Sequence, residues 1–190
     1  QRFHTRVYRT GPMRNGTLEG DLVLVASGDP NLSGREQEDG TYAFIDEDHS
    51  YGGQPLPTDP LTPIHDLARQ VEAKGVTKVT GQVIVDASLF REGQRELGTR
   101  MVMSPVVIND NIIDIVVTPG ARAGDPATVR VTPQTSYLTV SANLVTVEPG
   151  LPAGVRTIED STDRDHRVLV LSGRVPRGPN YVGLPNVRNY

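Results

Sequence analysis

The supply of β-branched side chains constrains the fold of this chain more than any other feature. Val, Ile and Thr number 24, 8 and 17 among the 190 residues, whereas Ala occurs only 10 times. β-branched side chains lose freedom in helices and pack well on a pleated sheet. There are also 19 Gly and 15 Pro residues spread along the chain, as in proteins with many turns. The composition therefore predicts an α+β, strand-rich fold built from short strands.

Charge and residue types exclude several classes of protein. The net charge is −4, so no nucleic-acid-binding face is expected, because phosphate binding needs clustered Lys and Arg. The chain has no Cys, which excludes disulfides, thiolate zinc sites and a cysteine nucleophile. No apolar run approaches ~18 residues, so no membrane span is expected. Because the chain starts at Gln1 and no signal peptide follows, we expect a processed product or an excised fragment.

The first half of the chain is predicted to hold a small α/β module. Residues 3–9 alternate between apolar and polar side chains, which is the period of a half-buried strand. Asn15-Gly16 predicts a two-residue hairpin turn, because both residues tolerate the positive φ of a type I′ turn. Residues 17–26 are then predicted as the returning strand, and residues 76–86 as a strand pair or a bulged strand.

One helix is predicted in this module, just after residue 61. Thr62 is expected to cap it and Pro63 to occupy its first turn, where a missing N–H costs nothing. Leu67 lies at the centre of an apolar stripe and is expected to be buried against the strand that holds Val83 and Val85. The full stripe follows the helical period i, i+3, i+4, i+7 and consists of Ile64, Leu67, Ala68 and Val71.

The second half of the chain is predicted to be a β-sandwich-like module. From residue 106 onward only strand patterns occur, separated by turns that contain Pro and Gly. We place the boundary near Ser104-Pro105, which gives an α/β module over residues 17–103 and a β-sandwich-like module over residues 104–176. The strands are predicted at residues 106–117, 127–131, 137–147 and 167–175.

An acidic segment precedes the predicted helix. Eight acidic residues and no Lys or Arg lie between Arg35 and Arg69. Such a segment offers hard oxygen ligands, but their spacing matches no calcium-binding loop. We therefore interpret it as a solvated acidic loop without a metal. The alternative is a calcium-stabilised structural domain, in which Glu36, Asp46 and Asp48 would be ligands.

The chain carries no recognisable set of catalytic residues. Neither of its two lysines lies three residues after a serine, because Val71 stands at that place for Lys74 and Gly75 for Lys78. Nucleophile elbows and phosphate-binding glycine loops are also absent from the sequence. The four histidines are scattered and are interpreted as surface or boundary residues: His4, His49, His65 and His166. No catalytic residue, metal or cofactor is predicted.

Several short segments, in this order and spacing, resemble one family over nearly the whole chain. They include Arg2-Phe3-His4-Thr5, Ser27-Gly28-Asp29-Pro30-Asn31-Leu32, Ser88-Leu89-Phe90, Ser104-Pro105, Asn109-Asp110-Asn111, Thr118-Pro119-Gly120 and Gly173-Arg174-Val175-Pro176, together with residues 16–24 and 75–86. The set resembles the accessory region of class C low-molecular-mass penicillin-binding proteins. These are serine-type D-alanyl-D-alanine carboxypeptidases and endopeptidases.

The resemblance implies that this chain is the insertion of such an enzyme without its catalytic domain. In the family, inserted modules interrupt the transpeptidase domain after its nucleophile helix. The Ser-x-x-Lys motif would then precede Gln1, and the Ser-x-Asn and Lys-Thr-Gly motifs would follow Tyr190. Residues 1–16 and 177–190 would connect toward the missing transpeptidase domain. The implied partners are that domain and peptidoglycan, and the implied location is periplasmic or extracellular.

The resemblance also points to a substrate-binding position. In relatives, a carboxylate and an apolar residue shortly before the Ser-Pro turn receive the amino end of the third-residue side chain of the stem peptide. Met103 corresponds to the apolar residue, whereas Gly98 stands at the place of the carboxylate and Glu96 lies two residues earlier. The plainer interpretation is that Glu96 is a solvated loop acid and Met103 a packing residue. A further alternative for the whole chain is a stand-alone secreted binding or adhesion module.

Overall fold

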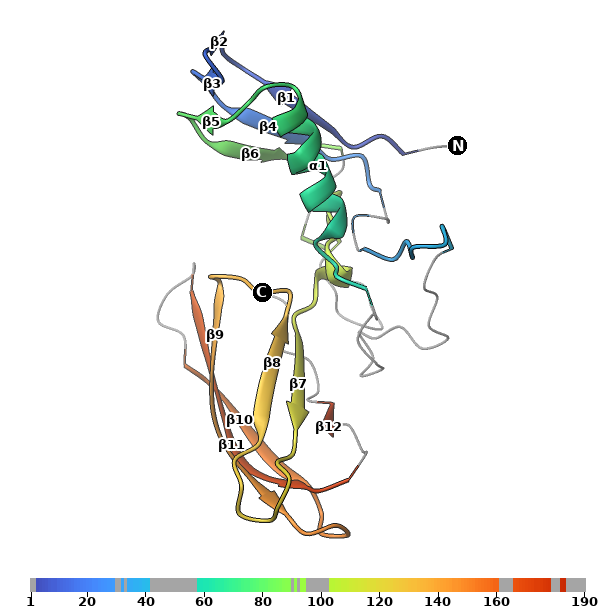
Figure 1. Cartoon of the computed structure of the whole chain (residues 1–190), viewed down its shortest axis with the longest axis vertical. Helices are drawn as coiled ribbons and strands as arrows, with labels where there is room; N and C mark the ends of the chain where they lie inside the picture. The colour runs from blue at the N-terminus through green and yellow to red at the C-terminus, as the bar shows by residue number, and fades with distance from the viewer. Residues whose placement is uncertain are drawn as a thin grey trace. The chain divides into compact units, whose positions relative to one another are not determined.

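The chain divides into two compact units in the computed structural model (Figure 1). The structure describes residues 3–29, 32, 34–41, 58–89, 91, 93–94, 103–160, 166–178 and 182–183. Unit 1 comprises the described residues up to 112, and unit 2 those from 113 onward. Both are rich in strands and unit 1 holds the helix, which confirms the predicted strand-rich α+β class. The module limits at residues 17–103 and 104–176 stay a prediction.

Unit 1 begins with the predicted hairpin. Its elements are β1 (Arg6–Arg9), β2 (Met13–Arg14), β3 (Thr17–Leu18), β4 (Leu22–Val25), α1 (Thr62–Ala73), β5 (Lys78–Val79), β6 (Val83–Asp86) and the short 3-10 helix η3 (Asn109–Asn111). Strands β2 and β3 pair antiparallel around Asn15 and Gly16, whose φ angles are 47° and 80°. Positive φ at both central residues is the geometry predicted for this turn.

The strands of unit 1 form two small sheets, in the orders β1-β4-β6 and β2-β3-β5. The strand predicted over residues 17–26 is broken into β3 and β4, so the prediction of one continuous strand is wrong. Three glycines explain the break, because their backbones approach too closely for side chains. A Cβ on Gly20 would lie 2.8 Å from the amide nitrogen of Gly11, and one on Gly81 would lie 2.6 Å from the carbonyl oxygen of Gly20. Residues 76–86 form two strands, β5 and β6, but these lie in different sheets, so the prediction of a strand pair or a single bulged strand is wrong.

Helix α1 begins differently from the prediction. Its N-cap is Leu61, and Thr62 already belongs to the helix, so the predicted capping role of Thr62 is wrong. Asp59 organises this end instead: its Oδ1 accepts from the Leu61 N–H at 2.9 Å and its carbonyl accepts from the Thr62 N–H at 3.1 Å. At the other end Gly75 adopts a φ of 87°, a left-handed closing residue.

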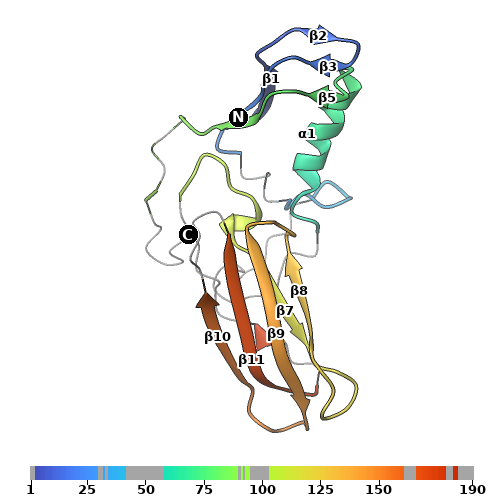
Figure 2. The same cartoon turned by 90° about the vertical axis from the view of Figure 1, so that its left-hand side faces the viewer.

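Packing of α1 is looser than its apolar stripe suggests. The helix runs along one side of the unit 1 strands (Figures 1 and 2), but none of its side chains is fully buried. Leu67 is half-buried, while Val83 and Val85 are 72% and 52% exposed. The prediction that Leu67 is a core residue against these valines is therefore wrong.

Unit 2 is a β-sandwich of two three-stranded sheets, as predicted. One sheet has the order β10-β11-β9 and the other β12-β7-β8. In the first, β11 pairs antiparallel with β10 and parallel with β9 over ten residues. A bridge between Pro126 and Val145 links the two sheets. The strands are β7 (Asp114–Thr118), β8 (Thr128–Thr132), β9 (Leu138–Val147), β10 (Gly154–Asp160), β11 (Arg167–Pro176) and β12 (Val182–Gly183).

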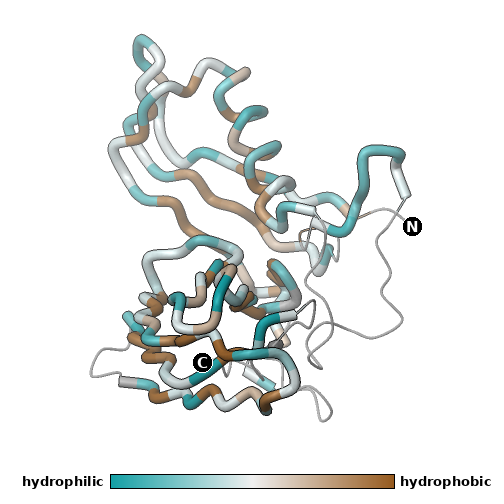
Figure 3. The backbone as a smooth tube through the Cα atoms, turned by 60° about the horizontal axis from the view of Figure 1, so that its bottom comes forward, coloured by the Kyte–Doolittle hydropathy of each residue, from teal (hydrophilic) through white to brown (hydrophobic). Residues whose placement is uncertain are grey.

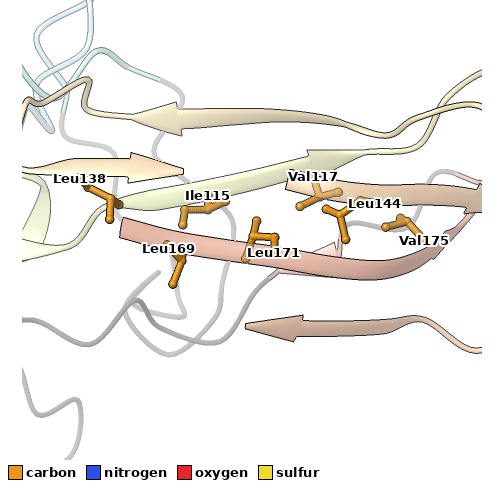
Figure 4. Close-up of a cluster of buried hydrophobic side chains, with 7 residues drawn as sticks. All are labelled: Ile115, Val117, Leu138, Leu144, Leu169, Leu171 and Val175. Carbon is orange, nitrogen blue, oxygen red and sulfur yellow. The ribbon is translucent and has the colours of Figure 1, made fainter. Parts of the chain in front are cut away.

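The core of unit 2 comes from both sheets (Figure 4). Its buried side chains are supplied by β7, β9 and β11: Ile115, Val117, Leu138, Leu144, Leu169, Leu171 and Val175. Strand β10 was not predicted, because its sequence lacks a buried alternating face. Only Val155 is half-buried among its described side chains, and Ile158 is 59% exposed. As a border strand, β10 is specified by pairing with β11 and not by burial.

Candidate functional site

Three of the segments that carry the family resemblance meet in unit 1. The Thr5 hydroxyl lies 3.2 Å from the Ser27 hydroxyl and donates to Asp29 Oδ2 at 3.4 Å. In the same turn the Gly28 N–H donates to the Pro105 carbonyl at 3.1 Å. Pro105 is fully buried. Residues far apart in the sequence are thus joined by hydrogen bonds, and the Ser-Pro turn is anchored beside residues 27–29.

Met103, the predicted apolar substrate-binding residue, directly precedes this anchored turn. Its N–H donates to the Gln94 carbonyl at 2.8 Å, and its carbonyl accepts from the Gly93 N–H at 3.4 Å. The Met103 residue is 39% exposed, so it is open to a ligand or to another part of the protein. Glu96, its predicted companion, lies outside the described residues. The structure therefore places one of the two predicted residues and leaves their pairing a prediction.

The described part of the acidic segment forms an open pocket in unit 1. The pocket has a volume of about 880 Å³. Gly34, one of its lining residues, lies close against Pro60: a Cβ on Gly34 would be 2.6 Å from Pro60 Cα. The lining comes from residues 34–39, residues 58–59 and the first turn of α1, and includes the acids Glu36, Glu38, Asp39, Asp59 and Asp66.

Local hydrogen bonds hold the carboxylates of this pocket. Asp39 Oδ1 accepts from the Thr41 hydroxyl at 2.6 Å and from the Thr41 N–H at 2.9 Å. The hydrogen bond from the Thr41 hydroxyl lowers the pKa of Asp39 below its usual value, and the hydrogen bond from the Thr41 N–H lowers it further. Asp66 forms an ion pair with Arg69 on the next turn of α1. Asp39 and Asp66 thus both have partners within this segment, which suits a solvated surface.

No metal centre is assembled in the part of the chain that the structure describes. Within those ranges no three His, Asp or Glu side chains gather closely enough to hold an ion. Of the ligands in the calcium alternative, Glu36 lines the acidic pocket, while Asp46 and Asp48 lie outside the described residues.

The described histidines belong to both units of the chain. His4 and His65 are exposed, and His49 lies outside the described residues. His166 bridges the start of the β9–β11 pair: its Nδ1 donates to the Ser136 carbonyl at 2.9 Å, and its Nε2 lies 3.2 Å from the Thr139 hydroxyl. These contacts give His166 a structural role in unit 2.

Comparison with known proteins supplies the family. The family model of the D-Ala-D-Ala carboxypeptidase 3 (S13) family matches residues 1–185. The chain belongs to this family. The resemblance inferred from the short sequence segments is thereby confirmed. The hydrogen bonds of Thr5 with Ser27 and Asp29, and of Gly28 with Pro105, describe how a member of the S13 family joins three of these segments. That joining is a feature that sequence order alone did not reveal.

Solved structures share the fold of this S13 chain. Penicillin binding protein 4 (dacB) from Haemophilus influenzae matches with a TM-score of 0.58 and 17% identity, over 96% of this chain and 36% of that protein. The same protein complexed with a novel β-lactam matches with a TM-score of 0.51 and 16% identity, over 96% and 33%. The S13 chain thus spans about a third of the length of these neighbours. No curated protein matches the sequence. Among the described residues, no helix is long and apolar enough to cross a membrane.

Proposed function

We propose that the chain is a non-catalytic accessory region of a serine-type D-Ala-D-Ala carboxypeptidase or endopeptidase that acts on peptidoglycan stem peptides. One observation carries this proposal: the S13 family model matches residues 1–185, yet the chain contains no Ser-x-x-Lys pair. Acyl transfer by a serine needs the nucleophile and its base within hydrogen-bond reach. The catalytic serine therefore belongs to another part of the protein.

The missing part would be the transpeptidase domain of the same protein. In this proposal residues 17–103 and 104–176 are the two accessory modules, and residues 1–16 and 177–190 lead toward that domain. The lengths of the solved neighbours support this arrangement, because the chain corresponds to 36% and 33% of them. The substrate places the whole protein in the periplasm or outside the cell.

Penicillin labelling tests the assignment of the nucleophile. The 20.6 kDa chain, incubated with a fluorescent penicillin and run on a denaturing gel, is expected to stay unlabelled. The longer protein encoded by the same reading frame is expected to be labelled, because a serine acylated by a β-lactam survives denaturation. A labelled band from residues 1–190, or an unlabelled longer protein, would contradict the proposal.

Met103 is proposed to contribute a substrate subsite, together with Glu96. The support is its exposed side chain beside the anchored Ser-Pro turn. In the longer protein, Met103→Ala is expected to lower kcat/KM for stem peptides with an amino group on the third-residue side chain. Leu151→Ala, a change at another exposed apolar residue, is the control. An equal effect of both variants would remove Met103 from the site.

A further inference from the structure

Strand β6 forms one border of the β1-β4-β6 sheet in the described part of the chain. On its inner side the Gln82 carbonyl accepts from the Leu22 N–H at 2.9 Å and the Asp86 carbonyl from the Ala26 N–H at 3.0 Å. Backbone groups alternate in direction along a strand, so Val83 and Val85 turn their N–H and C=O groups away from β4. They present an unfilled row of hydrogen-bonding groups at this border.

The first three side chains of β6 are apolar and exposed on both faces of the sheet, and Asp86 is its last residue. Val83, Ile84 and Val85 are 72%, 40% and 52% exposed. Leu89, just beyond the strand, is 58% exposed. Figure 3 shows that the backbone colours as hydrophobic along strands of this unit. An exposed apolar border strand that has no proline, and a charge only at its last residue, can pair with another strand.

The opposite border of the same sheet is protected. Strand β1 carries two exposed arginines, Arg6 and Arg9, at its two ends. Charged side chains on a border strand are a common defence against unwanted pairing. The border at β1 thus has a charge at both ends, whereas the border at β6 has a charge only at its last residue, after three consecutive exposed apolar residues.

We propose that β6 is completed by a strand of the same protein that lies outside residues 1–190. This inference rests on the proposed function, which assigns the chain to a longer protein. The solved neighbours leave 64% and 67% of their length unmatched, the remainders of 36% and 33%, which is ample for such a strand. A covalently linked strand is the favoured occupant because a four-residue border offers few hydrogen bonds. Linkage supplies the high effective concentration that so small a contact needs.

Amide hydrogen exchange tests this proposal directly. The Val83 and Val85 amides should exchange quickly in residues 1–190 and at least about 100-fold more slowly in the longer protein encoded by the same reading frame. The Val7 and Arg9 amides are the matched control. They turn outward at the protected border, since the Thr10 N–H donates inward to the Asp21 carbonyl at 3.1 Å, and their exchange should not change.

A pair of lysine substitutions provides an independent measurement. Val85 and Tyr8 are both 52% exposed, on opposite borders of one sheet. Val85→Lys should lower the Tm of the longer protein and leave that of residues 1–190 nearly unchanged, because the charge would be buried only in the completed sheet. Tyr8→Lys should leave both melting temperatures nearly unchanged.

The outcomes separate this inference from the proposed function. Suppose the longer protein reacts with penicillin, but its Val83 and Val85 amides still exchange quickly and Val85→Lys does not change its Tm. That result would overturn the inference about β6 and leave the proposed function intact. Protection at Val83 and Val85 without penicillin labelling overturns the proposed function alone. If the Val83 and Val85 amides exchange more slowly as the concentration of residues 1–190 rises, a second copy of the chain covers β6, and the inference is wrong. A reading frame that adds no residues would overturn both proposals.

Discussion

The two units of this chain bury their apolar residues very differently. Unit 2 gathers seven buried side chains from facing sheets into one cluster. Unit 1 buries few apolar side chains among its described residues, chiefly Leu18, Ala26 and Leu32. In the described ranges, seven of the ten exposed large apolar residues lie in unit 1: Phe3, Tyr8, Val83, Ile84, Val85, Leu89 and Met103. Unit 2 closes its own core, whereas unit 1 has an apolar surface left to cover.

Strand length explains much of the contrast. Strands β9 and β11 each have ten residues and pair along their whole length, so their sheet offers a long continuous inner face. The strands of unit 1 have two to four residues, and its one helix buries no side chain fully. Short strands need further strands or helices around them to be stable. The difference teaches that a similar β-rich composition yields a closed core where a sheet with long paired strands packs against a second sheet.

The largest expected effect is in the core of unit 2. Leu171 is fully buried on β11. Leu171→Ala should lower the free energy of unfolding by ~2–5 kcal/mol, because it removes a buried isobutyl group and leaves a cavity. Leu151→Ala, at a residue 49% exposed, is the control and should change it by less than ~0.5 kcal/mol. Urea denaturation measures both, and similar losses would show that unit 2 lacks a closed core.

A close backbone approach in unit 2 gives the next largest effect. Gly173 has a φ of 128°, and a Cβ there would lie 1.9 Å from the Gly154 carbonyl oxygen. Gly173→Ala should cost on the order of 1–3 kcal/mol or more, since it adds a clash to a strained backbone. Gly150→Ala separates the two causes, because Gly150 has a φ of 85° but no atom within 4 Å of its Cβ position. If thermal unfolding shows equal losses, the clash with Gly154 is not the cause.

A substitution at Leu67 tests how much helix α1 contributes to a buried core in unit 1. The residue is half-buried, so Leu67→Ala should lower the free energy of unfolding by about 1 kcal/mol, well below a core substitution. Chemical denaturation of the 190-residue chain gives the value. A loss above ~2 kcal/mol would restore the sequence prediction of a core position and weaken the contrast between the units.

The smallest effect concerns the acidic pocket of unit 1. Thr41→Val removes the hydroxyl that donates to Asp39, so the pKa of Asp39 should rise toward its ordinary value. In the native chain this pKa is depressed, so Asp39 contributes stability that is present above its unfolded pKa. That stability is lost as the pH falls through its folded pKa. An NMR titration of Asp39 checks the shift, with Thr128→Val in unit 2 as control. An unchanged pKa in Thr41→Val would assign the depression to the backbone hydrogen bond alone.

Much of the candidate site could be named from the sequence, but its assembly could not. The order of short segments indicated the family, and the missing Ser-x-x-Lys pair is the basis of our proposal that the catalytic serine lies elsewhere. Met103 was also named in advance, by resemblance. The hydrogen bond from Gly28 to Pro105, which anchors the turn beside Met103, joins residues more than 70 positions apart. No local pattern encodes such a contact.

Local backbone chemistry is what the sequence by itself determined. Asn15-Gly16 forms its predicted turn because both residues readily adopt a positive φ. Helix α1 forms because its apolar residues recur at the helical period within a short stretch of sequence. Tertiary structure alone decided which strands break, which border strands pair and how deeply a stripe is buried. The glycine contacts that divide residues 17–26, the pairing of β10 with β11 and the exposure of β6 all depend on partners distant in sequence. The periodicity of the sequence indicates which side chains form an apolar face. The number and length of the neighbouring strands decide whether that face is buried.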